Sequence, residues 1–152
     1  MNSEYNEILQ EIAAIASKYG QGLQPPCSES QLDRLRMESV KNLGDDTPPE
    51  YLAFLQQHNG LDWNGLSVYA TERMSVAGSP NAIIGGFVEE NLNRRDIPKW
   101  SRYLVFADTG DDCYCLRLLD RKYCLIDAVA LEEIEEFQSF DQMVAEALQK
   151  RI

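Results

Sequence analysis

Residues 47–65 read Thr47-Pro-Pro-Glu-Tyr-Leu-Ala-Phe-Leu-Gln-Gln-His-Asn-Gly-Leu-Asp-Trp-Asn-Gly65, and this stretch carries the clearest structural signals in the chain. Thr47 can cap a helix, Pro48 suits the first helical position, where a missing N–H costs nothing, and Glu50 completes a capping box. Apolar residues then recur at helical spacing. The pattern predicts a helix over 48–58.

The second half of this stretch leads from the helix into a sheet. Asn59-Gly60 ends the helix, because these residues readily adopt the left-handed backbone found at helix ends. Trp63 follows, and Asn64-Gly65 is a turn that starts a strand over 66–70. The sequence therefore predicts a short helix that delivers a tryptophan to the edge of a sheet.

The rest of the chain places further helices before and after a group of strands. Capping patterns mark helix starts at Ser28 and Ser139, and Pro98 stops a short helix. The other predicted helices are 5–19, 28–43, 89–95 and 140–150. The predicted strands are 66–70, 103–107, 113–118 and 123–126, and the first of them is expected to extend through 71–74. This order predicts an α+β fold with a central, largely antiparallel sheet flanked by helices.

The 152 residues suffice for one core, so we predict a single domain over 1–152, in which 1–27 form an N-terminal helix and loop. No run of eighteen apolar residues is present, so no membrane span is expected. Early acidic residues are the wrong charge for a secretory signal, which favours a cytoplasmic location. The predicted core residues are Phe54, Leu55, Val105, Leu116 and Leu148.

The formal net charge of −11 argues against nucleic acid as a partner, because phosphates require a basic surface. An acidic surface is usually a solvated one that keeps a protein soluble. It can also attract a basic protein partner. The charge therefore leaves two interpretations open.

The four cysteines are predicted to be free thiols that behave as small buried hydrophobic side chains. A zinc site is the alternative, because Cys113 and Cys115 share one face of a strand and Cys124 could lie beside them across a hairpin. This set lacks paired C-x₂-C spacing and a histidine nearby in the sequence. We expect neither a metal nor a cofactor.

Candidate catalytic groups are few. The only histidine, His58, is predicted on the apolar helix face, packed or bonded to a terminal carbonyl. Asp108, Asp111 and Asp112 could bind calcium or divide acid and base roles, but their spacing misses the EF-hand loop. Aspartate and glycine are also what a strand-connecting turn requires. A hydrolase that uses Asp108, Asp111 and His58 is the third choice of function.

The proline-led Glu50-Tyr-Leu-x-Phe-Leu helix that ends in Asn59-Gly60, followed by a glycine-started strand, resembles the SUKH superfamily of Smi/Knr-like domains. The resemblance runs from about Ser28 to the end of the chain. It continues in the Tyr103–Asp108 strand, the Gly110-Asp111 turn, the strand pair that follows and the Phe137–Phe140 entry to the last helix. The superfamily contains fungal cell-wall-synthesis regulators and many bacterial immunity proteins.

The resemblance implies a non-enzymatic immunity protein that neutralises a cognate polymorphic toxin, often a nuclease, in bacterial competition. The acidic charge fits a basic toxin domain as partner. A regulatory or scaffolding protein-interaction module is the alternative. Trp63 either anchors the partner or fills the core beside Tyr51. The acidic residues either speed association with the partner by electrostatic attraction or are merely solvated. The predicted partner-binding residues are Asp62, Trp63, Asp108, Asp111, Asp112, Glu132 and Glu133.

Overall fold

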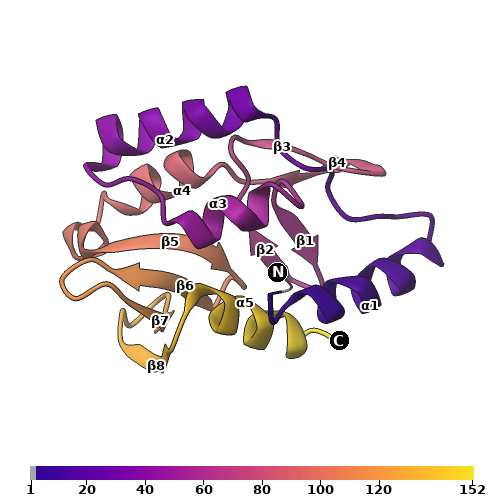
Figure 1. The fold of residues 1–152 in the computed structure, drawn as a ribbon. Coiled ribbons are helices and arrows are strands. Elements are labelled where there is room, and N and C mark those ends of the chain that lie inside the picture. Colours follow the sequence, from indigo (N-terminus) through magenta and orange to yellow (C-terminus); the bar gives the residue numbers. More distant parts are fainter. Residues whose placement is uncertain (1–2) are drawn as a thin grey trace.

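A six-stranded antiparallel sheet forms the centre of the protein, with helices packed on both of its faces (Figure 1). The structure is a computed structural model that describes residues 3–152, so the first two residues of the predicted 1–27 segment lie outside it. The elements are α1 Asn6–Ser17, α2 Glu29–Leu43, α3 Pro49–Leu55, β1 Leu61–Trp63, β2 Leu66–Val68, β3 Met74–Val76, β4 Ser79–Ile84, α4 Phe87–Arg94, the 3-10 helix η1 Pro98–Arg102, β5 Tyr103–Asp108, β6 Asp112–Arg117, β7 Lys122–Asp127, β8 Glu133–Phe137 and α5 Phe140–Gln149.

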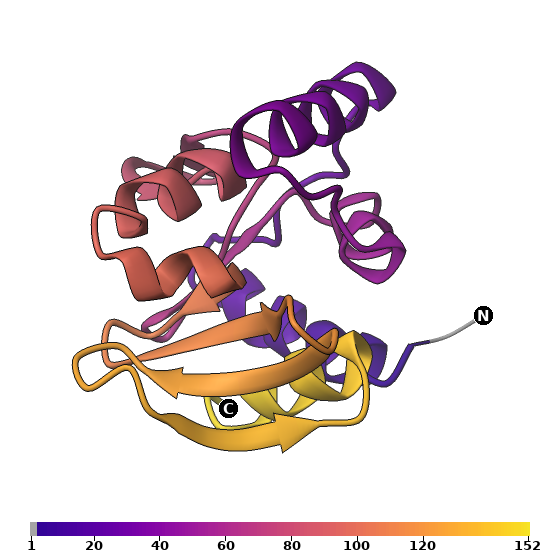
Figure 2. The same ribbon diagram turned by 90° about the vertical axis from the view of Figure 1, so that its left-hand side faces the viewer.

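The strand order is β1-β2-β5-β6-β7-β8, and β3 and β4 form a separate hairpin. All neighbouring strands in the large sheet are antiparallel. On one face Trp100 of η1 packs against Tyr103. On the other face lies α5 (Figure 2), and its Phe140 packs against Tyr123. This arrangement confirms the predicted α+β class with an antiparallel sheet between helices.

The core is built around a group of aromatic rings. Tyr51 of α3 is fully buried, and its ring centroid lies 5.1 Å from that of Phe87, 5.0 Å from Phe106 and 6.0 Å from Phe140. Its hydroxyl donates a hydrogen bond to the carbonyl oxygen of Tyr69 at 2.7 Å, which satisfies its buried polar atom. The five predicted core residues are all buried: Phe54, Leu55, Val105, Leu116 and Leu148.

Helix α3 differs at both ends from the predicted 48–58. Pro49 occupies the first helical position, because Pro48 precedes another proline and is held in an extended conformation (φ −62°, ψ 141°). The predicted capping box is wrong. The backbone N–H of Thr47 instead donates to Oδ1 of Asp46 at 2.7 Å, and no side chain caps α3. The helix then ends three residues before the predicted position.

The apolar residues at helical spacing predict that Tyr19 of the 5–19 helix, and Met37 and Val40 of the 28–43 helix, belong to the buried faces, and this prediction is wrong for all three. Tyr19 lies beyond the end of α1 and is 77% exposed. Met37 and Val40 of α2 are 67% and 53% exposed, because the buried side of α2 is formed by Leu35, Ser39 and Leu43, which follow a spacing of four. The capping box of α2, from Ser28 to Gln31, is present as predicted.

The segment between β2 and β5 was the least accurately predicted. The expected extension of the first strand into 71–74 is wrong, because β3 pairs with β4 as a separate hairpin. Helix α4 begins at Phe87 instead of 89, with Gly86 at its N-cap. The elements η1 and β8 were not predicted. No helix within residues 3–152 is both long and apolar enough to cross a membrane.

Candidate functional site

Asp108, at the end of β5, is bound to neighbouring side chains and is not a free carboxylate. Its Oδ2 accepts a hydrogen bond from the Tyr69 hydroxyl. The same oxygen forms an ion pair with Arg94, whose Nη2 lies 3.2 Å away. The Arg94 guanidinium also lies 5.5 Å from the centre of the Tyr69 ring. Burial raises the pKa of Tyr69, so its hydroxyl remains a donor. Asp108 therefore joins the end of β5 to Tyr69, the residue after β2, and to α4.

The β5–β6 turn and the β7–β8 loop lie side by side at one end of the sheet, and both carry acidic residues. In the β5–β6 turn, the carbonyl oxygen of Asp111 accepts a hydrogen bond from the N–H of Ala128, in the β7–β8 loop, at 2.8 Å. Asp112 faces Asp127 across β6 and β7. The carbonyl oxygen of Glu132, where the loop ends, accepts from the Asp127 N–H at 2.9 Å.

We call Asp111, Asp112 and Glu132 the acidic corner. Asp111 and Glu132 are exposed, and Asp112 is partly exposed. Within residues 3–152 none of the three carboxylates forms an ion pair. These side chains are therefore available to a positively charged partner.

Glu133, the first residue of β8, belongs to a network centred on Arg117. Arg117 Nη1 lies 2.6 Å from Glu133, and its Nη2 lies 2.7 Å from Asp120 and 2.8 Å from Glu136. The Tyr103 hydroxyl also donates to Glu133 at 3.2 Å. The hydrogen bond from Arg117 lowers the pKa of Asp120. The network ties β8 to β6.

Asp62 and Trp63 lie on β1, at the opposite edge of the sheet from β8. The indole N–H of Trp63 donates to the carbonyl oxygen of Arg151 at 3.1 Å, so this half-buried side chain holds the end of the chain after α5. Asp62 is exposed, although partial burial raises its pKa. The two edges are about 24 Å apart at the usual strand spacing. The seven predicted residues therefore do not form one patch.

Three cysteines share one face of the sheet. Cys115 lies directly opposite Cys124 across β6 and β7, and Cys113 lies two residues along. All three are buried, and with Cys27 they are free thiols. Burial raises the pKa of Cys113 to about 11 and that of Cys124 to about 12. Within residues 3–152 no group of three or more His, Cys, Asp or Glu side chains is arranged to hold a metal ion.

We expect the buried thiols to react with a disulfide reagent at pH 8 about a hundredfold more slowly in the native protein than in denaturant. The raised pKa leaves little thiolate at this pH, and burial limits access. The measurement is thiol titration of Cys27→Ser, which removes the half-buried Cys27. The native rate should rise tenfold per pH unit. Fast reaction of two native thiols in this variant would contradict the structure.

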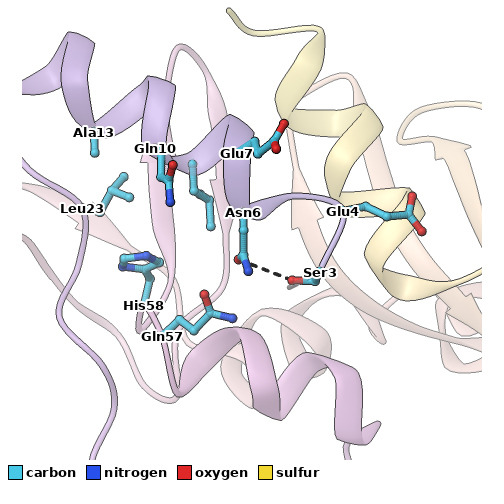
Figure 3. A pocket seen from close by; sticks show the side chains of 10 residues that line it. Ser3, Glu4, Asn6, Glu7, Gln10, Ala13, Leu23, Gln57 and His58 are labelled. Atoms are coloured by element: carbon cyan, nitrogen blue, oxygen red, sulfur yellow. Dashed lines mark hydrogen bonds between the residues drawn. The ribbon is translucent and has the colours of Figure 1, made fainter. Parts of the chain in front are cut away.

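His58 lies beyond the end of α3 and not on the predicted helix face. Its Nδ1 is 2.8 Å from the carbonyl oxygen of Gln24. The ring lines an open groove of about 700 Å³, where His58 and Gln57 face α1 (Figure 3). Neither Asp108 nor Asp111 lines this groove, so the three residues of the proposed hydrolase do not share a site.

Sequence reasoning missed the two arginines that form ion pairs with Asp108 and Glu133, two of the predicted partner-binding residues. Arg94 binds Asp108, and Arg117 binds Glu133 and Glu136. One signal was present in the sequence. Arg117 lies in the predicted strand 113–118, where a charged side chain needs a partner of opposite charge, and the glutamate-rich segment 132–136 follows soon after.

The sequence was compared with protein families and with curated proteins. Residues 26–146 match the SMI1 / KNR4 family (SUKH-1). This match covers most of the chain, from before α2 into α5, and it confirms the SUKH resemblance. A search of curated proteins gave no match. The chain therefore belongs to the SMI1 / KNR4 family (SUKH-1).

Proposed function

We propose that this protein is a non-enzymatic binding protein, an immunity protein that neutralises a cognate nuclease-type toxin in bacterial competition. Membership of the SMI1 / KNR4 (SUKH-1) family supports a role in binding another protein. The observation that carries the proposal is the acidic corner, whose three carboxylates have no ion pair within residues 3–152. The net charge of −11 adds to the negative potential around it.

The mechanism is electrostatic capture followed by occlusion. A nuclease holds phosphate on a positively charged surface, and the acidic corner presents fixed negative charge to that surface. The attraction acts over about 8–10 Å at ordinary salt concentrations and speeds encounter between the proteins. Once bound, the immunity protein covers the surface that the nucleic acid needs.

The test is the rate of association with a nuclease-type toxin domain sought among the genes that neighbour this one. We expect the triple variant Asp111→Asn, Asp112→Asn, Glu132→Gln to bind about tenfold more slowly at low salt, because steering depends on these charges. Its association rate should also depend less on salt concentration. Asp108 is left unchanged because it holds β5 to α4.

The matched control is the triple variant Glu11→Gln, Glu29→Gln, Glu38→Gln. It removes the same charge from exposed positions on α1 and α2. If both variants slow association equally, net charge and not the acidic corner drives binding. If the native protein does not bind the toxin or protect cells that produce it, the immunity function is wrong.

A further inference from the structure

The two edges of the large sheet differ in how they are covered. β1 is covered along one edge, because residues of the 21–24 loop enclose a small cavity together with Leu61, Asp62 and Trp63. β8 ends the strand order at the other edge. In both ribbon views it lies at the margin of the molecule with no element beside its outer side (Figures 1 and 2).

β8 is also the most acidic element of the sheet. Four glutamates lie on the strand or immediately before it, namely Glu132, Glu133, Glu135 and Glu136. Arg117 forms ion pairs with two of them, Glu133 and Glu136. Within residues 3–152 no ion pair reaches Glu132 or Glu135. The strand therefore continues the negative surface of the acidic corner along the open edge.

A bulge leaves one apolar side chain between these acids. Ile126 of β7 pairs with Glu133 and Leu125 pairs with Glu135, so Ile134 has no partner in the register. Ile134 is 55% exposed. The edge strand therefore carries one exposed apolar side chain, Ile134, between Glu133 and Glu135.

An uncovered edge strand presents N–H and C=O groups that can pair with another strand. A second copy of this protein is disfavoured as the partner, because two β8 strands side by side would place like charges together. A strand rich in lysine and arginine would gain both backbone hydrogen bonds and ion pairs. The charge of the edge therefore selects a basic extended segment.

We infer that β8 receives an extended, Lys- and Arg-rich segment of the partner as a seventh strand of the sheet. This rests on the proposed function, in which the partner is a basic toxin domain. The acidic corner attracts the partner, and β8 then fixes its register through backbone hydrogen bonds and the contact at Ile134.

The first test uses a fluorescent nine-residue peptide in which lysine and valine alternate. It should bind the native protein and slow hydrogen exchange at the Glu133–Phe137 amides. A peptide N-methylated at its five central residues keeps the charge but loses backbone donors, and its affinity should fall at least tenfold. Equal affinity of the two peptides would overturn the inference, because charge alone would then explain binding.

The second test compares two charge-matched double variants. Glu132→Lys with Glu135→Lys should weaken peptide binding at least tenfold, whereas Glu29→Lys with Glu38→Lys, on α2, should not. Circular dichroism checks that each variant is folded. Equal losses would overturn the inference, as would protection of the same amides in a dimer of the native protein.

The two proposals can fail separately. If the adjacent toxin binds without protecting the Glu133–Phe137 amides, β8 is not the receiving strand but the immunity function stands. If the peptide pairs with β8 and the toxin does not bind, the edge site stands and the immunity function is wrong.

Discussion

Replacing Phe54 with alanine is expected to lower the free energy of unfolding by about 3–5 kcal/mol. The side chain is fully buried, and its ring centroid lies 5.4 Å from that of Tyr5 in an edge-to-face contact. Truncation leaves a cavity between α3 and the N-terminal end of α1, and packed aromatic neighbours refill such a space poorly. Urea denaturation monitored by circular dichroism measures the change.

Two variants serve as controls for Phe54→Ala. Phe54→Leu keeps most of the apolar volume, so its loss should be clearly smaller. Tyr19→Ala removes an aromatic ring that is 77% exposed, and it should change stability by less than about 0.5 kcal/mol. If Phe54→Ala costs no more than Tyr19→Ala, Phe54 does not lie in the core.

Replacing Asn91 with alanine is expected to cost about 2–4 kcal/mol, because it leaves buried backbone groups without partners. Asn91 of α4 is 2% exposed. Its Nδ2 donates to the carbonyl oxygens of Phe87 at 2.8 Å and Val105 at 2.9 Å, and its Oδ1 accepts from the Val105 N–H at 2.8 Å.

The position of Val105 explains why this asparagine is needed. β2 pairs with β5 only at Ser67 and Val68, opposite Asp108 and Ala107, so no strand reaches Val105 on that side. The Asn91 amide supplies the donor and acceptor that a neighbouring strand would supply. One side chain thus extends the hydrogen bonding of the sheet into the helix layer.

The control for Asn91→Ala is Asn93→Ala, at an exposed position of the same helix. It should change stability by less than about 0.5 kcal/mol. Hydrogen exchange at the Val105 amide should quicken in Asn91→Ala and stay unchanged in Asn93→Ala. A stable Asn91→Ala protein with a protected Val105 amide would show that this bond does not support the sheet.

The sequence predicted well where local signals agree with burial. The strands from 103 to 127 are continuous apolar runs bounded by turn residues, and they occur within a residue or two of the predicted positions. The α2 capping box needs only residues that are three apart. In these segments local chemistry and tertiary packing favour the same structure.

The errors have physical causes that lie outside local patterns. Consecutive prolines moved the start of α3, because each restricts the residue before it. The bulge at Ile134 breaks the alternation that would have identified β8. At the candidate site, the engagement of Asp108 by Arg94 depends on how β5 and α4 pack. No spacing rule reports such a contact.

Helix α1 packs against α5, and this contact has a consequence for how the protein is made. α1 leaves the ribosome before α5, because it precedes α5 by more than a hundred residues in the chain. A helix of 12 residues is barely stable alone, so α1 gains the stabilising contact with α5 only after α5 has been synthesised. The family match over 26–146 excludes α1 and ends before Ala147 and Leu148 of α5. The unit that folds together is therefore longer than the segment that identifies the family.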